Sequence, residues 1–130
     1  MLLDSNIIIY ASKPECAFLK PLLGDDRTVV SGISYPEVLG FTELTVQDKT
    51  DFEEFFATTP VLPVGEDVLH RAAELRQSRK MKLGDAIVAA TALIHRVTLA
   101  TRNISDFSWI PELALSNPFD QPSTPGSMQT

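Results

Sequence analysis

The sequence has little of several features that define common protein classes. Its single cysteine, Cys16, excludes an intrachain disulfide bond and favours a reducing compartment. No window approaches the roughly 20 apolar residues of a membrane helix. The first residues, Met-Leu-Leu-Asp, lack the cationic and apolar regions of a secretory signal. We therefore expect a cytoplasmic protein that makes no contact with a membrane.

Signals for binding phosphate or nucleic acid through a common motif are also sparse. The six glycines are scattered, and no Gly-x-x-x-x-Gly-Lys sequence is present, which argues against a P-loop protein. The 17 acidic residues outnumber the 11 basic ones, so the formal net charge is −6. This balance argues against a general nucleic-acid-binding protein, which depends on extended basic surface.

Short apolar runs alternate with helical patterns along the chain. At 130 residues and 44% hydrophobic, the sequence suits one globular domain. The apolar runs cover residues 1–3, 28–32, 60–64, 97–101 and 113–116. Strands separated by helices of about ten or more residues indicate βαβ units and a parallel sheet. The expected fold class is therefore α/β.

Three helical segments should cover this sheet. Two of them present apolar faces, formed by Val68, Leu69, Ala72 and Leu75 in one and by Phe52, Phe55 and Phe56 in the other. Residues 86–94 are apolar almost all round, so a helix there should be buried on most sides. Residues 120–130 have no periodicity and little apolar surface, so we expect a domain over 1–119 followed by a disordered tail over 120–130.

Four acidic residues stand out because each follows an apolar run or opens a helical pattern. They are Asp4, Glu37, Asp85 and Asp106. Ligands of open α/β sheets bind outside the carboxyl ends of the strands, so we expect the four carboxylates to meet there. Two carboxylates about 4 Å apart repel by about 4 kcal/mol at an effective dielectric constant near 20. Such a cluster requires protons or cations.

Each of these acids also has a purely structural interpretation. Ser34 and Glu37 fit a helix capping box, and Asp85 fits the N-cap of the following helix. Asp4 and Asp106 fit turn positions. These interpretations are compatible with a metal site, because a helix N-terminus can orient a carboxylate that also binds a cation.

The residue types around the acids favour one kind of cation. Carboxylate ligands without a companion histidine or cysteine favour Mg²⁺ or Mn²⁺ over zinc, with one or two ions in the site. Carboxylate-bound Mg²⁺ serves phosphodiester hydrolysis by generating a nucleophile and stabilising the leaving oxygen. Asn6, Thr101 and Asn103 flank the acids and are candidates for orienting ligands or water, although ordinary caps and turns also explain them.

Basic residues near the acids are candidate contacts to RNA phosphates. They are Arg76, Arg79, Lys80, Lys82 and Arg102. The alternative for the first four is that cations near a helix C-terminus complement the helix dipole.

The segments that contain the acids form an ordered set. They read LLDSNIIIY at 2–10, SYPEVLG at 34–40, KLGDAIVAATA at 82–92 and LATRNISDF at 99–107. Together they resemble the PIN-domain ribonucleases, especially the VapC toxins of bacterial toxin–antitoxin pairs, over about residues 1–119. The resemblance implies a three-layer α/β/α sandwich with a parallel sheet ordered 3-2-1-4-5. It also implies Mg²⁺- or Mn²⁺-dependent cleavage of RNA, a homodimer, and inhibition by a small cognate antitoxin protein.

The resemblance assigns roles to particular residues. The family's acidic quartet, catalytic and metal-binding, falls on Asp4, Glu37, Asp85 and Asp106, with Asp4 and Asp85 as the main metal ligands. Some relatives carry the last acid at the position of Asn103, so the resemblance leaves the choice between Asn103 and Asp106 open. The family often has threonine in place of Ser5 and proline in place of Gly84.

Two other functions fit parts of the pattern. A phosphotransfer enzyme with an aspartyl nucleophile would place an acid after the first strand, but such enzymes use Asp-x-Asp, whereas this chain has Asp4-Ser5-Asn6. A PIN-like interaction module would keep the fold without turnover, but it has no need to retain mutually repelling acids. The leading hypothesis is a metal-dependent endoribonuclease, the toxin of a toxin–antitoxin pair.

Overall fold

Five short parallel strands form the centre of the molecule in a computed structural model that describes residues 1–120. They are β1 (Leu2–Leu3), β2 (Val30–Ser31), β3 (Val61–Leu62), β4 (Leu99–Ala100) and β5 (Leu115–Ser116). Each lies within one of the five apolar runs, so the predicted strand positions are confirmed.

The order of the strands follows from their pairing. Strand β1 pairs with β4, which pairs with β5, while β2 pairs with β3. A parallel bridge between Leu2 and Val29 joins the two groups, and the Leu3 N–H donates to the Val29 carbonyl over 3.1 Å. The order across the molecule is therefore β3-β2-β1-β4-β5, as the resemblance implies.

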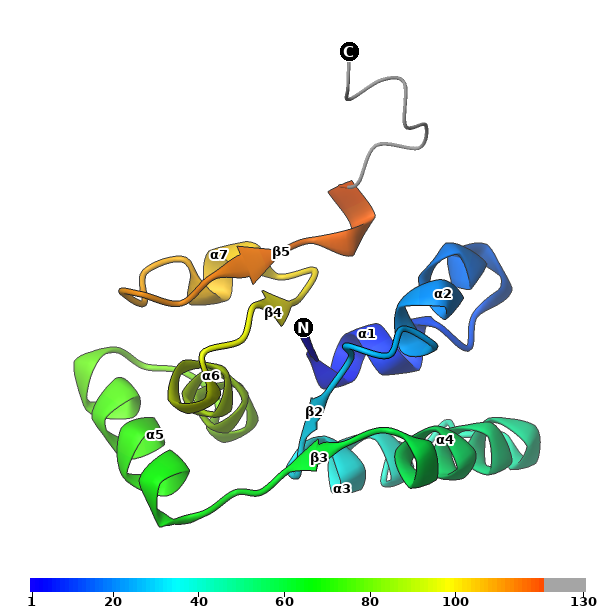
Figure 1. Ribbon diagram of the computed structural model, residues 1–130, viewed down its shortest axis with the longest axis horizontal. Helices are drawn as coiled ribbons and strands as arrows, with labels where there is room; N and C mark the ends of the chain where they lie inside the picture. The colour runs from blue at the N-terminus through cyan, green and yellow to red at the C-terminus, as the bar shows by residue number, and fades with distance from the viewer. Residues whose placement is uncertain (121–130) are drawn as a thin grey trace.

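Helices cover both faces of the strands. The α-helices are α1 (Ser5–Tyr10), α2 (Lys20–Leu23), α3 (Ser34–Leu39), α4 (Val46–Thr58), α5 (Glu66–Ser78), α6 (Leu83–His95) and α7 (Ile104–Phe107), and the 3₁₀ helices are η1 (Pro14–Leu19) and η2 (Pro118–Asp120). Helices α5 and α6 lie on one side of the strands in Figure 1, and α1 to α4 lie on the other. The α/β/α layering is confirmed. No helix within residues 1–120 is both long and apolar enough to cross a membrane.

Strands β1 and β4 each contribute to two separate cores. Leu2 and Leu99 pack with α5, α6 and α7, whereas Leu3 and Ala100 pack with the helices of the opposite layer. Successive side chains of a strand point to opposite faces of the sheet, so even a two-residue strand serves both layers.

Helix α6 is the most deeply buried helix of the domain, as its composition predicts. All of residues 86–92 are buried. The one polar side chain among them, Thr91, donates its hydroxyl to the Ile87 carbonyl over 2.7 Å and lies 3.1 Å from the Ser31 hydroxyl. Its hydrogen bonds are therefore satisfied within the core.

Two helical positions differ from the sequence-based expectation. Leu69 is 48% exposed. The buried face of α5 is formed by Val68, Ala72 and Leu75, and the helical spacing places Leu69 at the edge of that face. Phe52 and Phe56 are buried, whereas Phe55 is only partly so. Of the expected tail over 120–130, Asp120 ends η2 and the remaining residues lie outside the described part.

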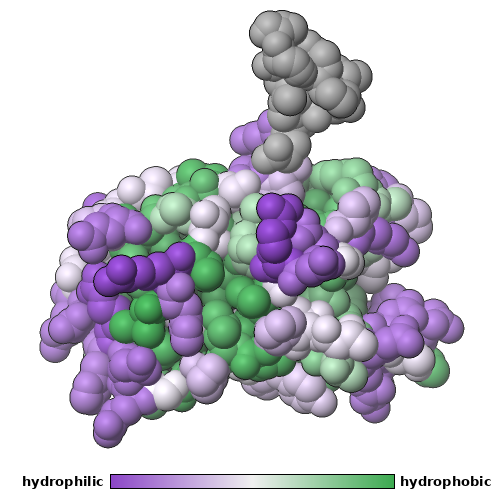
Figure 2. Space-filling model, in the orientation of Figure 1, coloured by the Kyte–Doolittle hydropathy of each residue, from purple (hydrophilic) through white to green (hydrophobic). Residues whose placement is uncertain are grey.

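The surface is mixed in character. Figure 2 shows apolar surface across the middle of one face, with hydrophilic side chains around it. Exposed aromatic and aliphatic side chains include Phe18, Tyr35 and Leu83.

Candidate active site

Each of the four acids lies at the N-terminal end of a helix. Asp4 is the N-cap residue of α1, directly after β1. Glu37, Asp85 and Asp106 lie in the first turns of α3, α6 and α7. Helices α3 and α7 follow β2 and β4, so this placement gathers acids at the carboxyl edge of the sheet.

Asp4 is the most deeply buried of the four. Only 5% of the residue is exposed, and its Oδ2 accepts a 2.9 Å hydrogen bond from the Thr101 hydroxyl. The pKa of Asp4 is raised to about 6, mainly by burial and also by the nearby charges of Asp85 and Glu37, although the hydrogen bond from Thr101 lowers it. The protein therefore holds this carboxylate at a cost that a bound cation would offset.

Asp85 is close enough to Asp106 and Glu37 for their charges to affect it. Burial raises its pKa above the ordinary value, and the charges of Asp106 and Glu37 act in the same direction. The ammonium group of Lys82 partly opposes them. Asp85 is thus the acid that links Asp4 and Glu37 on one side with Asp106 on the other.

Glu37 is held by a short chain of hydroxyl groups and does not form the capping box that Ser34 and Glu37 fit in sequence. The Ser5 hydroxyl donates to Glu37 Oε1 over 2.6 Å and lies 2.8 Å from the Ser34 hydroxyl. Because the one Ser5 proton goes to Glu37, Ser34 is the donor to Ser5. Helix α3 begins after Ile33 without a side-chain cap, so both residues of the expected box are used elsewhere.

The other acids are not helix caps through their side chains either. Helix α6 has Lys82 at its N-cap, so Asp85 lies inside the first turn, and no cap hydrogen bond forms at that end. Asp4 has the N-cap position of α1 but makes no capping hydrogen bond. The purely structural explanations therefore account for little of this cluster.

The four acids line two hollows on the surface, and Asp85 lines both of them. The first hollow, about 490 Å³, is lined by Asp4, Ser5, Asn6, Ile9, Tyr10, Lys13, Glu37, Phe41, Lys82 and Asp85. The second hollow, about 260 Å³, is lined by Arg79, Lys80, Met81, Lys82, Asp85, Ser105, Asp106 and Trp109. Asp85 and Lys82 stand where the two meet.

The basic residues separate into two groups. Arg79, Lys80 and Lys82 line the second hollow. Arg76 instead donates its Nε–H to the Met81 carbonyl over 3.2 Å, which ties the loop between α5 and α6 to α5.

Arg102 is held away from the second hollow by aromatic rings. Its guanidinium carbon lies 4.2 Å from the Phe119 ring centroid and 5.3 Å from that of Tyr10. Tyr10 lines the first hollow, so Arg102 lies on that side of the site.

The three flanking polar residues also have different positions. Thr101 is fully buried and contacts Asp4 directly, whereas the exposed Asn6 lines the first hollow. Asn103 takes part through its backbone, since its N–H donates to Thr101 Oγ1 over 3.1 Å. Neither hollow is lined by Asn103, whereas Asp106 lines the second.

Sequence reasoning missed three residues of this region. Ser5 and Ser34 form the hydroxyl chain to Glu37, and Trp109 lines the second hollow with its ring under Arg79, 4.9 Å from the guanidinium carbon. The only available signals were that Ser5 follows Asp4 and that the one tryptophan lies three residues after Asp106.

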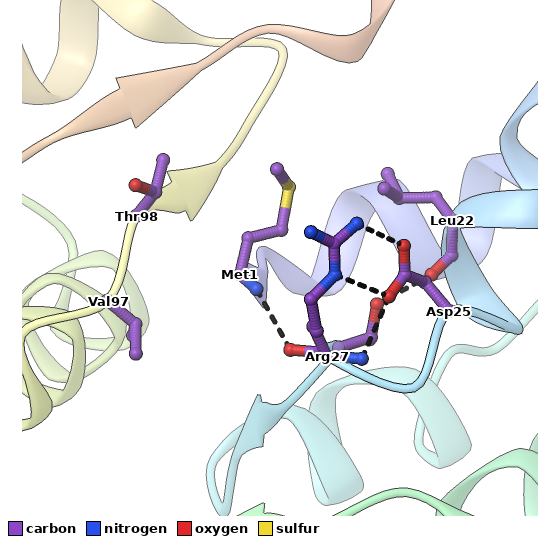
Figure 3. Close-up of a pocket in the computed structure, with 7 residues that line it drawn as sticks. Met1, Leu22, Asp25, Arg27, Val97 and Thr98 are labelled. Atoms are coloured by element: carbon purple, nitrogen blue, oxygen red, sulfur yellow. Dashed lines mark hydrogen bonds and ion pairs between the residues drawn. The ribbon is translucent and has the colours of Figure 1, made fainter.

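Hollows at the opposite, amino edge of the sheet have a different character. Figure 3 shows one of about 320 Å³, where the Met1 ammonium group donates to the Arg27 carbonyl and Arg27 pairs with Asp25. Charges there are already matched in a local ion pair, so this hollow offers no comparable chemistry.

The donor chemistry of the site fits a hard divalent cation. The candidate ligands are carboxylate oxygens, and the pKa of two of them is raised partly by neighbouring acids. Within residues 1–120, no three acidic, histidine or cysteine side chains converge closely enough to form a complete metal-binding group. The acids instead influence one another through their charges, since Asp85 raises the pKa of Asp4 and Asp106 raises the pKa of Asp85.

Comparison with known proteins gives a consistent result. The family model of the PIN domain matches residues 1–111. A toxin–antitoxin complex from Klebsiella pneumoniae contains a chain that is 32% identical, with a TM-score of 0.74 and coverage of 90% of this chain and 96% of that one. FitAcB from Neisseria gonorrhoeae is 26% identical, with a TM-score of 0.72 and coverage of 92% and 99%.

A third structure agrees with these in fold. VapBC2 from Rickettsia felis, bound to a DNA fragment from its promoter, is 23% identical, with a TM-score of 0.71 and coverage of 89% and 96%. No curated protein sequence matches the chain.

Proposed function

The chain belongs to the PIN domain family, and from this we propose that it is a metal-dependent endoribonuclease, the toxin of a toxin–antitoxin pair. The observation that carries the proposal is the pair of adjoining hollows that share Asp85. They collect four acids, of which Glu37 and Asp85 do not form the helix caps that the sequence predicts.

Asp4 and Asp85 would hold Mg²⁺ or Mn²⁺, and Asp106 would add a ligand directly or through water. When bound, the cation supplies a water of lowered pKa and neutralises charge that develops on the phosphate. Thr101 orients the Asp4 carboxylate through Oδ2, so the ligand geometry is fixed before substrate arrives.

Glu37 would take up the proton of the attacking water. Ser5 fixes the carboxylate through Oε1, so Oε2 would accept a proton from the attacking water. The water oxygen then bonds to phosphorus, one P–O bond of the RNA backbone breaks, and the two product ends carry a phosphate and a hydroxyl group. Lys82, next to Asp85, would contact the phosphate during this step.

The direct test is RNA cleavage in Mn²⁺ by the wild type and by Asp4→Asn. We expect the variant to lose cleavage by at least about a hundredfold, because a metal ligand is gone. Equal activity in the two proteins would exclude the metal role of Asp4. A trapped phospho-aspartate at Asp4 would instead favour the phosphotransfer enzyme, and absence of divalent-cation binding in calorimetry would favour a module without turnover.

The partners follow from the same proposal. The similar structure from Klebsiella pneumoniae is a toxin–antitoxin complex by name, which supports a cognate antitoxin protein as the partner of this chain. We also propose a homodimer and a cytoplasmic location. Induced expression with mapping of new RNA 5′ ends would identify the target. Rescue of growth by a neighbouring small reading frame would identify the antitoxin.

A further inference from the structure

Trp109 is an aromatic surface fixed beside the acids. Its Nε1–H donates to the Asp106 carbonyl over 3.0 Å, and its ring packs partly against the core formed by α5, α6 and α7. The Arg79 guanidinium carbon lies 4.9 Å from the ring centroid. The indole is therefore attached to the helix that carries Asp106 and has a cation over one face.

The rim of the second hollow concentrates positive charge in a protein of net charge −6. Arg79, Lys80 and Lys82 fall within four residues and all line this hollow. Over residues 1–120 the ion pairs are Arg27–Asp25 and Arg71–Glu74, so none of these three cations is neutralised by an ion pair in that part of the chain. A negatively charged ligand of this hollow meets cations at its rim and reaches Asp85 and Asp106.

We propose that the second hollow binds one nucleotide of a single-stranded RNA, with its base against the Trp109 indole and its phosphate on Arg79 and Lys80. This rests on the proposed ribonuclease function and defines where the strand lies relative to the cleaved bond. The volume of about 260 Å³ suits one unpaired nucleotide and not a duplex.

The chemistry of each group agrees with this assignment. Unpaired bases stack on aromatic side chains regardless of sequence, and arginine forms bidentate contacts to phosphate. An exposed cation–π contact is weak, so the base replaces the guanidinium on the ring while Arg79 turns to the phosphate. The shared Asp85 then places this nucleotide next to the phosphate that is cleaved in the first hollow.

The single tryptophan makes the proposal directly measurable. A short fluorescein-labelled oligoadenylate is titrated into the Asp4→Asn protein in EDTA, which prevents cleavage, and anisotropy reports binding. In a second titration with the unlabelled oligoadenylate, we expect saturable quenching of the tryptophan emission. Its midpoint should fall at the same RNA concentration as the midpoint of the anisotropy titration. A double-stranded RNA should not quench it.

Variants separate the two contacts. We expect Trp109→Leu and Arg79→Gln each to raise the Kd about tenfold, which corresponds to the loss of one stacked base or one phosphate contact. Trp109→Phe, which keeps an aromatic ring, should stay near the wild-type Kd and shows that loss of binding is not loss of folding. Arg71→Gln is the control. It also removes one positive charge, from an α5 residue that is already paired with Glu74, and it should leave the Kd unchanged.

The outcomes distinguish the two proposals. Binding in anisotropy with unchanged tryptophan emission, or equal quenching by duplex RNA, would overturn the nucleotide subsite and leave the ribonuclease intact. If the wild type cleaves RNA and Trp109→Leu cleaves it with the same KM, the subsite is likewise overturned and the ribonuclease function stands. Absence of both binding and Mn²⁺-dependent cleavage would overturn the ribonuclease and the subsite together.

Discussion

The Thr101 hydroxyl donates a 2.9 Å hydrogen bond to Asp4 Oδ2, joining the carboxyl ends of two adjacent parallel strands across 97 positions of sequence. Both residues are buried, and Thr101 Oγ1 also accepts the Asn103 N–H. One hydroxyl group therefore orients the most buried acid and the start of α7.

Replacing Thr101 with valine should separate this role from packing. Thr101→Val keeps the shape but removes a donor to Asp4 and an acceptor for Asn103, so we expect the free energy of unfolding to fall by about 1–3 kcal/mol. Affinity for Mn²⁺ should fall about tenfold in calorimetry. The control Thr91→Val removes a buried hydroxyl from α6, away from the acids, and should destabilise the protein without changing Mn²⁺ affinity. An equal effect of the two variants on Mn²⁺ binding would contradict the orienting role.

The buried carboxyl of Asp4 should make stability depend on pH. Its pKa is about 6 in the folded protein against 3.8 in the unfolded reference, so between these values the folded state holds a proton that the unfolded state has released. The stabilising contribution is fully present below about pH 3.8 and is lost as the pH rises through about 6. A difference of about two units corresponds to about 3 kcal/mol.

Urea denaturation in EDTA tests this dependence. Asp4→Asn should unfold with a free energy about 1–3 kcal/mol higher than wild type at pH 7.5, and the advantage should shrink as the pH falls toward 4.5. Glu53→Gln, at an exposed position of α4, is the control and should show no such trend. Identical stability of Asp4→Asn and wild type at pH 7.5 would exclude a strained ionised carboxylate.

The hydroxyl chain predicts unequal effects for its two serines. Ser5→Ala removes the donor to Glu37 Oε1, so the cleavage rate should fall about tenfold while KM changes little. Ser34→Ala leaves that hydrogen bond in place, so the cleavage rate should fall by less than about threefold. Single-turnover cleavage in Mn²⁺ measures both. A larger loss in Ser34→Ala than in Ser5→Ala would reverse the assigned direction of the chain.

Gly84 leaves space for Glu37. A Cβ atom at this position would overlap the Glu37 Oε2 oxygen, which is the mobile end of a long side chain. We expect Gly84→Ala to raise the free energy of unfolding by about 0.5–1 kcal/mol through its helix propensity, yet to lower cleavage several-fold by displacing the carboxylate. If Glu37 mediates the loss, adding Gly84→Ala to Glu37→Gln should lower cleavage no further. Gly24→Ala, whose Cβ would meet only ordinary contacts, is the control for the assay.

Asp106 rather than Asn103 should complete the acidic site. Asp106 lines the second hollow with Asp85 and raises the pKa of Asp85 by its charge. Asp106→Asn should therefore lower cleavage at pH 7 by about tenfold or more and shift the acidic limb of the pH profile to lower pH. Asn103→Ala, which keeps the backbone N–H, should stay within about twofold. A larger loss in Asn103→Ala would assign the position to the asparagine.

The fold was largely accessible from the sequence, for identifiable reasons. Five apolar runs located the strands, and the continuous apolar stretch at 86–94 located the buried helix, because burial on both sides of a sheet leaves a strong compositional signal. Leu69 was misplaced because a spacing of one residue from Val68 turns a helical side chain by about 100 degrees, to the edge of the buried face.

The arrangement of the site was less accessible. Positions at strand ends and helix starts brought the four acids together in the prediction, but Ser34 and Glu37 also satisfied the spacing of a capping box, which the fold does not form. Sequence spacing cannot show that Ser5 competes for the same carboxylate from a different helix. Nor can it show that the acids fall into two hollows, because that division depends on where side chains of α6 and α7 meet.

Strand β1 is two residues long. Leu2 packs in one core, Leu3 packs in the other, and Asp4 reaches the edge of the sheet where the acids lie. A substitution at any of the three alters a single task. An insertion or deletion of one residue would exchange the two cores and withdraw the carboxylate in one step. The depth of the Asp4 carboxylate is therefore set by its spacing from Leu2 and Leu3, and this part of the domain tolerates a change of side chain far better than a change of spacing.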